Sequence, residues 1–454
     1  MTATAPKPAA AAVADELPAG FRFGAATASY QVEGAAREDG RGESIWDRFS
    51  HSPGNVVNGD TGDVACDHYH RWASDLDLMV ALGLESYRFS IAWPRVQPDG
   101  RGPLNARGVA WYRRLAEGLL ERGIEPVATL YHWDLPQARQ EVGGWAVRDT
   151  ALRFADYAAE MAAALGDVVQ GWITHNEPWV VAFLGHAHGR KAPGIRDWPT
   201  ALAVSHNLLL SHGLAVDALR AAGSAPVGIT LNLNPMRGEE PWAVGMMDAH
   251  QNRWFLDPVL RGEYPAEMLA YYEKVFGPLP VLNPEDMDVI SRPIDFLGVN
   301  YYNPTYVRAS SEGPLGVSTV VPRGATTAMG WPVDATGLYD MLTRLRADYG
   351  DLEIWITENG AAFDDERLVN GVVEDPSRVV YLSTHLDALR RAVGAGVNVK
   401  RYHAWSLLDN FEWEHGYDKR FGIVRVDYDT QERIPKRSAL WYRDHIAAVR
   451  GGGA

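Results

Sequence analysis

The chain has 454 residues, of which 46% are hydrophobic, and its 43 basic and 58 acidic residues give a net charge of −15. This size and apolar content allow a large core, whereas the acidic balance argues against nucleic acid or an anionic membrane as the main partner. The single cysteine, Cys66, excludes an internal disulfide and a zinc site built from several thiolates.

The N-terminal segment is rich in alanine and proline. Pro6 and Pro8, with Lys7 between them, interrupt any apolar core of the ~7–15 residues that a secretory signal needs. No apolar run in the sequence reaches the ~20 residues that span a bilayer. We therefore expect residues 1–17 to be a disordered tail, residues 18–450 to form one folded domain, and the protein to be cytoplasmic.

Short runs rich in β-branched and aromatic residues recur along the chain and are predicted strands. They cover residues 21–28, 86–93, 125–132, 171–176, 226–232, 295–302, 353–360 and 399–408. Amphipathic segments between them, such as residues 153–166 and 376–396, are predicted helices. Strands that alternate with helices are typical of parallel βαβ units, and eight such units predict an α/β fold, a single-domain (β/α)8 TIM barrel.

Polar side chains collect where these runs stop, which is where a barrel of this kind has its active site. They are Gln31 and Glu33, Arg88, His132 and Asp134, Asn176 and Glu177, Asn232, Asn300 and Tyr302, Glu358 and Asn359, and Asp409 and Glu412. A strand end that meets solvent explains any one of them, but it does not explain the whole set.

Two of the predicted strands end at a glutamate, and similar residues precede the two glutamates. The run Trp-Ile-Thr-His-Asn ends on Glu177, and the run Trp-Ile-Thr ends on Glu358. Ends of the fourth and seventh strands face the same barrel mouth, and two carboxylates across a pocket are the groups that glycosidic bond cleavage needs, one protonated and one ionised. Arg88 can hold one of them ionised, and Pro178 removes a backbone donor next to Glu177, which suits Glu177 as the acid.

Seven motifs, taken in the order in which they occur along the chain, resemble those of the family 1 glycoside hydrolases and, within that family, of the bacterial β-glucosidases. They are ASYQVEG, SYRFSIAWPRV, LYHWDLP, THNEPW, GVNYYNP, ITENG and AWSLLDNFEWEHGYDKRFGIVRVDY, and the resemblance covers nearly the whole chain. It implies a catalytic barrel over residues 18–450 and a retaining double displacement. In that mechanism Glu358 is the nucleophile, and Glu177 is first the acid and then the base. No cofactor and no metal are expected.

The resemblance also implies a set of sugar-binding residues. Arg88 is expected beside the nucleophile, Tyr302 to hold it, and Asn176 to bind the 2-hydroxyl. The other expected binding residues are Gln31, His132, Trp133, Asn300, Trp331, Trp405, Glu412 and Trp413. Carboxylates and amides suit hydroxyls, and an indole offers a flat apolar surface to a sugar ring.

The substrate implied by this resemblance is a small β-glycoside with a terminal, non-reducing β-D-glucosyl residue. Cello-oligosaccharides and aryl or alkyl β-glucosides are expected, with side activity on β-galactosides and β-fucosides. Glu412 would repel the phosphate of a 6-phosphoglycoside, and the presence of Glu177 separates the chain from thioglucoside-cleaving relatives that lack the acid.

Several alternatives stay open. A sugar-binding protein without activity is disfavoured because both glutamates are present. Glycosyl transfer to an acceptor other than water, the preferred glycone and homo-oligomer formation are not decided, while no nucleic-acid or membrane partner is expected. His186 and His188 have a spacing seen in metal sites, but they follow the fourth run instead of the first, so no metal is predicted. Residues 185–194 depart from the family pattern, and their contacts are not predicted.

Overall fold

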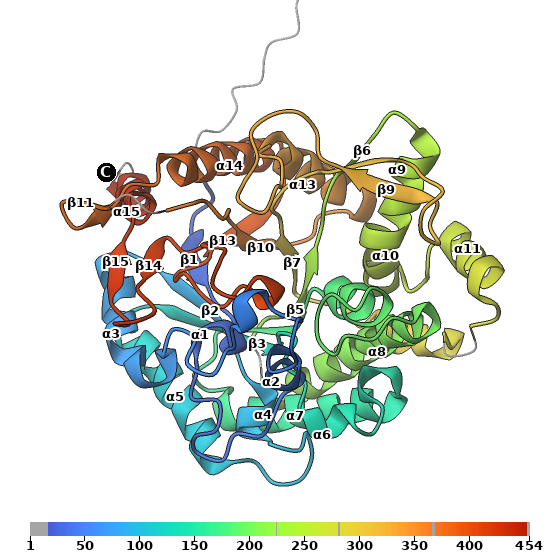
Figure 1. Ribbon diagram of the computed structural model, residues 1–454, viewed down its shortest axis with the longest axis horizontal. Helices are drawn as coiled ribbons and strands as arrows, with labels where there is room; N and C mark the ends of the chain where they lie inside the picture. Colours follow the sequence, from blue (N-terminus) through green and yellow to red (C-terminus); the bar gives the residue numbers. More distant parts are fainter. Residues whose placement is uncertain (1–16, 224, 280–281, 366–367, 452–454) are drawn as a thin grey trace, which may run out of the picture.

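The computed structural model describes residues 17–223, 225–279, 282–365 and 368–451. Within this part of the chain, eight parallel strands lie in the middle of the molecule and helices surround them (Figure 1). Hydrogen bonds close the strands into a barrel in the order β1, β2, β3, β4, β5, β7, β10, β13 and back to β1. The predicted single-domain TIM barrel is confirmed. The predicted tail of residues 1–17 lies, except for Leu17, outside the described residues.

Each of the eight predicted runs contains one barrel strand. The strands are β1 (Arg22–Ala26), β2 (Ser86–Ser90), β3 (Glu125–Tyr131), β4 (Gly171–Asn176), β5 (Val227–Asn232), β7 (Phe296–Asn300), β10 (Ile354–Asn359) and β13 (Val399–Trp405). Most of their residues are buried, because helices cover the outer face of the barrel and side chains fill its interior. Several predicted runs continue past the strand, because the residues that follow it already belong to the loop.

The α-helices lie in the connections between the barrel strands and, in the case of α15, after the last strand. These are α1 (Ser29–Val32), α2 (Ile45–Ser50), α3 (His68–Ala81), α4 (Trp93–Val96), α5 (Ala106–Glu121), α6 (Gln137–Gln140), α7 (Arg148–Leu165), α8 (Trp198–Ala222), α9 (Pro241–Asp248), α10 (Trp254–Arg261), α11 (Ala266–Phe276), α12 (Met287–Ile290), α13 (Thr336–Tyr349), α14 (Pro376–Gly394) and α15 (Arg437–Gly451). The helices predicted over residues 153–166 and 376–396 correspond to α7 and α14. The segments η3 (Val180–Ala187) and η4 (Ala249–Arg253) are π-helical, a form frequent at functional sites.

Short strands in the loops were not predicted by the sequence pattern. One sheet contains β6 (Met236–Arg237), β8 (Thr305–Ala309) and β9 (Val317–Val320), while β11 (Leu368–Val369) pairs with β12 (Val372–Val373) and β14 (Val424–Val426) pairs with β15 (Arg433–Pro435). Most of these strands are too short to show a hydrophobic alternation. They give fixed shapes to the loops that follow β5, β7, β10 and β13.

Apolar side chains fill the barrel interior near the beginnings of the strands. Trp355 stacks on Phe296 with ring centroids 3.5 Å apart, and Val127 and Ile173 complete this buried group. Gly171 makes room for Trp355, because a Cβ atom at Gly171 would lie 2.8 Å from the indole. The opposite end of the barrel, where the strands stop, is left for polar side chains.

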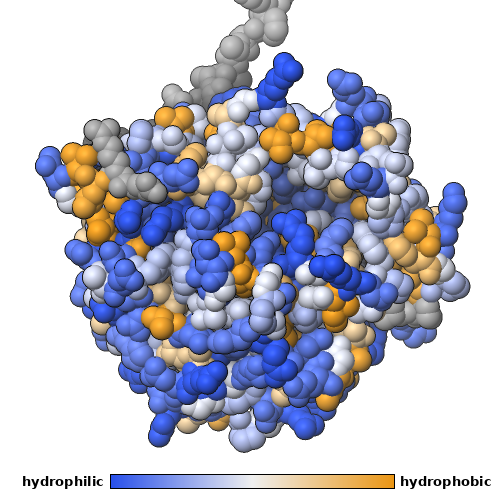
Figure 2. Space-filling view, in the orientation of Figure 1, coloured by the Kyte–Doolittle hydropathy of each residue, from blue (hydrophilic) through white to orange (hydrophobic). Residues whose placement is uncertain are grey.

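Hydrophilic residues cover most of the face seen in Figure 2, and hydrophobic residues occur there in small groups. Large exposed apolar side chains, such as Val64, Trp242 and Val321, come from separate segments of the chain. Scattered exposure of this kind is ordinary for a folded protein. None of the helices in the described ranges is both long enough and apolar enough to cross a membrane.

Candidate active site

Glu177 and Glu358 meet at the mouth of the barrel. Glu177 follows β4 directly, Glu358 belongs to the end of β10, and only 6% and 3% of these residues are exposed. Asn300, at the end of β7, lies next to both: its Nδ2 donates to Glu177 Oε1 at 2.7 Å, and it is the residue paired with Glu358 across the neighbouring strands. The barrel therefore places two buried carboxyls around one amide.

Glu358 accepts hydrogen bonds that stabilise its ionised form. Arg88 Nη1 donates to Glu358 Oε1 at 2.6 Å, and Tyr302 Oη donates to Oε2 at 2.5 Å. Burial raises the pKa of Glu358 above its ordinary value, and the charge of Arg88 and the hydrogen bond from Tyr302 limit that rise. These two donors act in favour of the carboxylate, which is the form that a nucleophile requires.

Glu177 is held by a neutral amide instead of a cation. Burial and the nearby charge of Glu358 raise the pKa of Glu177 to about 8, against a smaller lowering by the Asn300 hydrogen bond. Glu177 therefore keeps its proton at neutral pH, as a general acid must. The two carboxyls have different surroundings, and different surroundings are how one site obtains both an acid and a base.

Arg88 also fixes the orientation of Asn176. Arg88 Nη2 donates to Asn176 Oδ1 at 2.6 Å, and Asn300 Nδ2 donates to the same oxygen at 3.0 Å. Because the oxygen accepts these two bonds, the Asn176 amide nitrogen faces His132 and donates to its Nε2 at 3.0 Å. One N–H of Asn176 remains for a ligand hydroxyl.

Tyr302→Phe is expected to move the acid limb of the pH profile of kcat/KM to higher pH. A carboxylate that loses a hydrogen-bond donor is protonated more easily, so Glu358 becomes inactive at a higher pH than in the wild type. We expect kcat/KM to fall roughly 10–100-fold, the cost of losing a hydrogen bond to a charged group.

The matched control is Tyr301→Phe, because the Tyr301 hydroxyl donates to the backbone oxygen of Asp334 and not to a carboxylate. Initial rates measured across the pH range would give both profiles. An acid limb that stays in place in Tyr302→Phe would contradict the role of this phenol.

The polar groups predicted to bind sugar hydroxyls lie together on the far side of Asn176 from Glu358. Gln31 Nε2 donates to Glu412 Oε2 at 3.3 Å, and burial lowers the pKa of His132 well below its usual value, so its ring is neutral. Since His132 Nε2 accepts from Asn176, its Nδ1 carries the hydrogen. Gln31 Oε1 and His132 Nδ1 are buried and have no hydrogen-bond partner among the described residues. An unpaired acceptor and an unpaired donor are what sugar hydroxyls would satisfy.

Indole rings form the wall beside these groups. Trp133 and Trp413 contact each other with ring centroids 4.5 Å apart. The His132 ring stacks on Trp405 at 5.9 Å and on Trp413 at 6.0 Å. Flat apolar surfaces next to unpaired polar atoms match the two kinds of surface that a sugar ring presents.

Trp331 lies on the side of the site that holds the nucleophile. It is partly exposed, and its ring packs against Tyr302 at 5.4 Å and Phe421 at 6.0 Å. It belongs to the same apolar cluster as Trp405. Trp331 therefore lies next to the other predicted site residues, at the edge of the group that they form.

Three residues of this site have a strained backbone. Trp133, Glu177 and Trp413 have positive φ angles of 82°, 49° and 51°. Bulky residues rarely adopt the left-handed region, which costs of order 1–3 kcal/mol and persists where the surrounding structure imposes it, typically at functional sites. The backbone conformations that place these two indoles and this carboxyl therefore lower the stability of the folded chain.

The segment after β13, which carries Glu412 and Trp413, is anchored by buried charges. Asp409 Oδ1 accepts from Lys436 Nζ at 2.7 Å, and Lys436 Nζ also donates to Asp365 Oδ2 at 2.5 Å. All three side chains are almost completely buried. Lys436 is thus shared by two buried carboxylates beneath the site, and Arg378 also pairs with Asp365 and Arg420 with Asp409.

Lys436→Met is expected to lower the free energy of unfolding by about 3–5 kcal/mol, because Arg378 and Arg420 then face the three buried carboxylates of Asp365, Asp375 and Asp409, and one buried negative charge is left uncompensated. Lys419→Met is the matched control: Lys419 pairs with Asp418, whose side chain is 53% exposed, so we expect a loss of about 0–1 kcal/mol. Urea denaturation of both variants would measure the difference. Equal stability of the two variants would contradict this account of Lys436.

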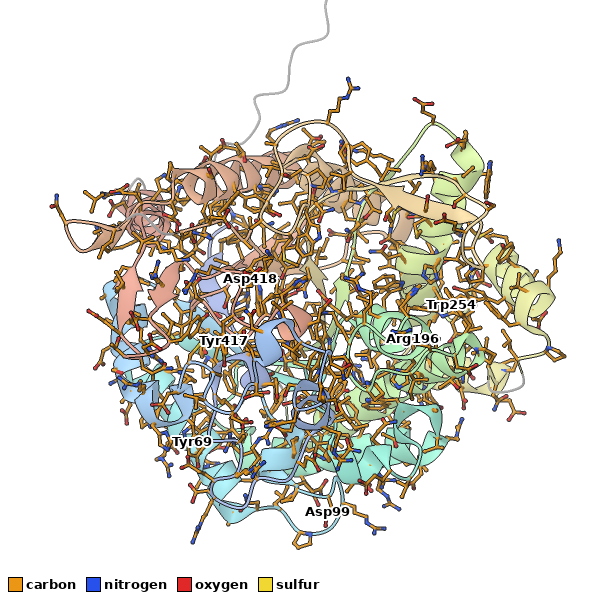
Figure 3. All side chains as sticks on the ribbon, viewed as in Figure 1. Tyr69, Asp99, Arg196, Trp254, Tyr417 and Asp418 are labelled. Atoms are coloured by element: carbon orange, nitrogen blue, oxygen red, sulfur yellow. The ribbon has the colours of Figure 1, made fainter. Side chains whose placement is uncertain are left out.

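The outer part of the same segment contacts the loop after β1. The Tyr417 hydroxyl donates to the backbone oxygen of Thr61 at 2.7 Å, and the Tyr417 N–H donates to Asp60 Oδ2 at 3.0 Å. Tyr417 and Asp418 lie toward the centre of the view in Figure 3. Contacts below and beside the segment thus hold the backbone that presents Glu412.

Helix α2 supports Trp413 from the side, because Trp46 contacts it with ring centroids 4.5 Å apart. Ser44 and Asp47 form a capping box that fixes where the helix begins.

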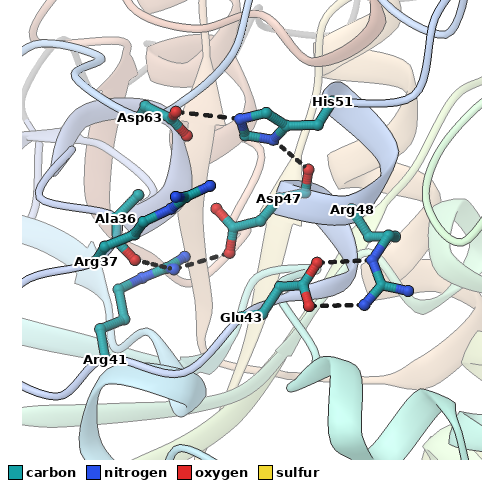
Figure 4. A pocket seen from close by; sticks show the side chains of 8 residues that line it. All are labelled: Ala36, Arg37, Arg41, Glu43, Asp47, Arg48, His51 and Asp63. Atoms are coloured by element: carbon teal, nitrogen blue, oxygen red, sulfur yellow. Dashed lines mark hydrogen bonds and ion pairs between the residues drawn. The ribbon is translucent and has the colours of Figure 1, made fainter.

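Figure 4 shows the ion pairs that line a cavity of about 420 Å³ beside this helix: Arg41–Asp47, Arg48–Glu43 and His51–Asp63. Opposite charges pair with one another here, and we assign no ligand to this cavity.

Sequence reasoning missed Lys191, although its loop was recognised as a departure from the family pattern. Lys191 Nζ donates to Glu414 Oε2 at 2.6 Å and lies 5.1 Å from the centre of the Trp133 ring. In the same loop, His186 is buried and its Nδ1 donates to a backbone oxygen, while His188 is exposed. Across the residues that the structure describes, no group of three His, Cys, Asp or Glu side chains is placed to hold a metal ion.

Comparisons with known proteins agree with this geometry. The family model described as "Glycosyl hydrolase family 1" matches residues 13–450. Beta-glucosidase A of Acetivibrio thermocellus is 50% identical over 440 residues, which cover 95% of this chain and 98% of that protein. A bifunctional beta-D-glucosidase/beta-D-fucosidase of Bifidobacterium breve is 46% identical over 454 residues, which cover 95% of this chain and 98% of that protein.

A solved structure gives the same result. The structure of beta-glucosidase from Thermotoga maritima in complex with glucoimidazole aligns with a TM-score of 0.92 at 45% identity, covering 96% of this chain and 99% of that chain. The likeness therefore extends over the barrel and its loops, including the loops that surround the two glutamates.

Proposed function

The chain belongs to glycosyl hydrolase family 1, and from that premise we propose that it is a retaining, exo-acting β-glucosidase. Its proposed substrates are cello-oligosaccharides and aryl or alkyl β-glucosides, from which it removes the terminal, non-reducing β-D-glucosyl residue. The Bifidobacterium breve relative is named as both a glucosidase and a fucosidase, which supports side activity on β-fucosides. β-Galactosides are proposed as further substrates because the side chains that bind the hydroxyls of a glucoside would also bind those of a galactoside.

The unequal surroundings of Glu177 and Glu358 are the observation that carries the proposal. Glu358 receives a guanidinium and a phenol, whereas Glu177 receives a neutral amide. The first arrangement favours a charged nucleophile and the second favours a protonated acid. Hydrolysis of a glycosidic bond requires this pair of protonation states.

The proposed reaction proceeds in two steps. Glu358 attacks the anomeric carbon while Glu177 gives its proton to the leaving oxygen, so that the glycosidic bond breaks and an ester bond to Glu358 forms. The ester carries no charge, and the charge of Glu358 is one reason for the raised pKa of Glu177. Glu177 then becomes a better base, takes a proton from water, and the water releases the sugar with its original β configuration.

The remaining N–H of Asn176 is proposed to bind the 2-hydroxyl next to the reacting carbon. Arg88 and Asn300 fix the Asn176 amide, so its direction is set before the substrate arrives. Hydrogen bonds to this hydroxyl strengthen in the transition state and contribute several kcal/mol in glycosidases.

Proton NMR of the wild-type reaction tests the proposal. With nitrophenyl β-glucoside, we expect β-glucose to appear first and α-glucose to form only by later mutarotation, while nitrophenyl α-glucoside stays intact. If α-glucose appeared first, the enzyme would be inverting and the proposed mechanism would be wrong. If no β-glycoside were cleaved, the proposed activity would be wrong and a sugar-binding role would replace it.

A further inference from the structure

The side-chain amide of Asn300 lies between Glu177 and Asn176. Its Nδ2 donates to Glu177 Oε1 at 2.7 Å and to Asn176 Oδ1 at 3.0 Å. The two ends of an amide have nearly the same shape, but one end donates hydrogen bonds and the other accepts them. Turned over, the amide would place its oxygen against Asn176 Oδ1 and would no longer donate to Glu177. The hydrogen bond to Glu177 therefore depends on which end of the Asn300 amide faces it.

Arg88 determines which atoms donate in this group of side chains. A guanidinium only donates, so the atom of Asn176 that Arg88 Nη2 contacts at 2.6 Å is the oxygen. The Asn300 atom that contacts the same oxygen is therefore the amide nitrogen, and the Asn300 oxygen points the other way. On that side Thr357 Oγ1 lies 2.7 Å from Asn300 Oδ1, so the Thr357 hydroxyl donates its hydrogen to the amide.

Other contacts hold Thr357 in the position from which it donates. Thr230 Oγ1 donates to Thr357 Oγ1 at 3.2 Å, and Arg88 Nη1 donates to the Thr357 backbone oxygen at 3.1 Å. Thr230, Thr357 and Asn300 are almost completely buried, and buried polar groups take their partners from within the protein. The backbone and the hydroxyl of Thr357 are therefore both fixed before a substrate binds.

An irregularity in β10 brings Thr357 to this place. Ile356 pairs with Val299 of β7, whereas Glu358 pairs with Asn300, the residue directly after Val299. Thr357 is thus an extra residue in this strand pairing, a bulge of the kind that redirects side chains next to active sites. Thr357 and Glu358 are consecutive, yet the side chains of both contact residues of the site.

We propose that Thr357 is a positioning residue, whose hydroxyl holds the Asn300 amide with its nitrogen toward Glu177 through both steps of the reaction. The inference rests on the proposed function, in which Glu177 first loses its proton and then acts as a base. An N–H donor stabilises the charged form of a carboxyl, so it supports Glu177 when Glu177 is ionised. Without the Thr357 hydroxyl, the Asn300 oxygen would be buried without this donor, and the amide would be held less firmly.

Thr357→Val removes the hydroxyl and keeps the branched shape of the side chain. With nitrophenyl β-glucoside, we expect kcat/KM to fall roughly tenfold, the effect of losing one hydrogen bond and leaving its buried partner unpaired. Thr357→Ser keeps the hydroxyl and should retain most of the activity. Thr174→Val is the matched control, because Thr174 is also completely buried but its hydroxyl bonds the His212 ring, so kcat/KM should change by less than about threefold.

The pH profile of kcat/KM distinguishes positioning from a general loss of stability. The hydrogen bond from Asn300 lowers the pKa of Glu177, so weakening that bond raises the pKa. Glu177 then keeps its proton up to a higher pH, and the basic limb of the Thr357→Val profile should move to higher pH. The limb should stay in place in Thr174→Val, even where that variant unfolds at a lower temperature. An unmoved basic limb in Thr357→Val would overturn the inference.

A double-mutant cycle with Asn300→Ala tests whether Thr357 acts through the amide. In the Asn300→Ala background the Thr357 hydroxyl has no amide to hold, so adding Thr357→Val should lower kcat/KM by less than about twofold. A tenfold loss in both backgrounds would overturn the inference, because Thr357 would then act by another route. Thr357→Ala takes the place of Thr357→Val in the profile and in the cycle if the valine variant does not fold.

The same measurements separate this inference from the proposed function. An active wild type whose kcat/KM is unchanged by Thr357→Val would overturn the inference and leave the proposed function intact. A wild type without activity on any β-glycoside would overturn both.

Discussion

Glu358→Ala is expected to reduce hydrolysis of nitrophenyl β-glucoside by roughly 10⁴-fold or more, because it removes the group that forms the covalent intermediate. The shortened side chain leaves a space beside the Arg88 guanidinium and the Tyr302 hydroxyl, which both donate to Glu358 in the wild type. These donors favour a small anion in that space. Azide should bind there, attack the anomeric carbon directly and restore turnover, giving α-glucosyl azide with inverted configuration.

The matched control is Glu358→Gln, in which the amide fills the space that azide needs. Both variants should be inactive in buffer, but only Glu358→Ala should respond to azide. Nitrophenol release and NMR of the sugar product would measure this. If Glu358→Ala kept most of its activity, or if azide produced β-glucosyl azide with it, Glu358 would not be the nucleophile.

Much of this site could be predicted because, in a barrel, the order of the strands along the chain determines where the residues at their ends lie around the mouth. Gln31 and Glu412 are 381 positions apart in the sequence, yet their side chains are in hydrogen-bonding contact. Each follows a strand, and neighbouring strand ends meet at one mouth whatever their separation along the chain. Apolar runs mark the strands, so the first polar residues after them mark the site.

Contacts between loops could not be predicted in this way. The pairing of Lys191 with Glu414 depends on the paths of two loops, and no periodic pattern encodes those paths. The same holds for Lys436, which reads as a surface lysine in the sequence but lies completely buried between Asp365 and Asp409. Buried charges of this kind follow from tertiary packing, since lysine is almost never buried unless it is paired.

The different surroundings of the two glutamates were only partly predictable. Arg88 was expected beside the nucleophile on the strength of the family resemblance. The residues themselves supplied only a weak reason to assign the acid role to Glu177, namely the missing donor at Pro178. The structure adds a stronger one: Asn300 offers Glu177 a neutral amide, while Glu358 lies close enough to raise its pKa.

Glu177→Ala is expected to affect substrates according to their leaving groups. Loss of the general acid should slow cleavage of a cello-oligosaccharide or an alkyl glucoside by roughly 10²–10⁴-fold, the usual contribution of proton transfer. Dinitrophenyl β-glucoside should still react in the first step, because its phenolate leaves without a proton. The glycosyl-enzyme should then accumulate, since the base that activates water is also missing, and a burst of dinitrophenol should precede slow turnover.

Two further readouts distinguish Glu177→Ala from Glu358→Ala. Azide should attack the accumulated glycosyl-enzyme and give β-glucosyl azide, the configuration opposite to that expected from Glu358→Ala. In the wild type, kcat/KM should fall as pH rises through the Glu177 pKa of about 8, because the proton needed by the leaving group is lost, and this basic limb should be absent in Glu177→Ala. An equal loss on all leaving groups, or the same azide product from both variants, would contradict the division of roles, because the two carboxyls would then act at the same step.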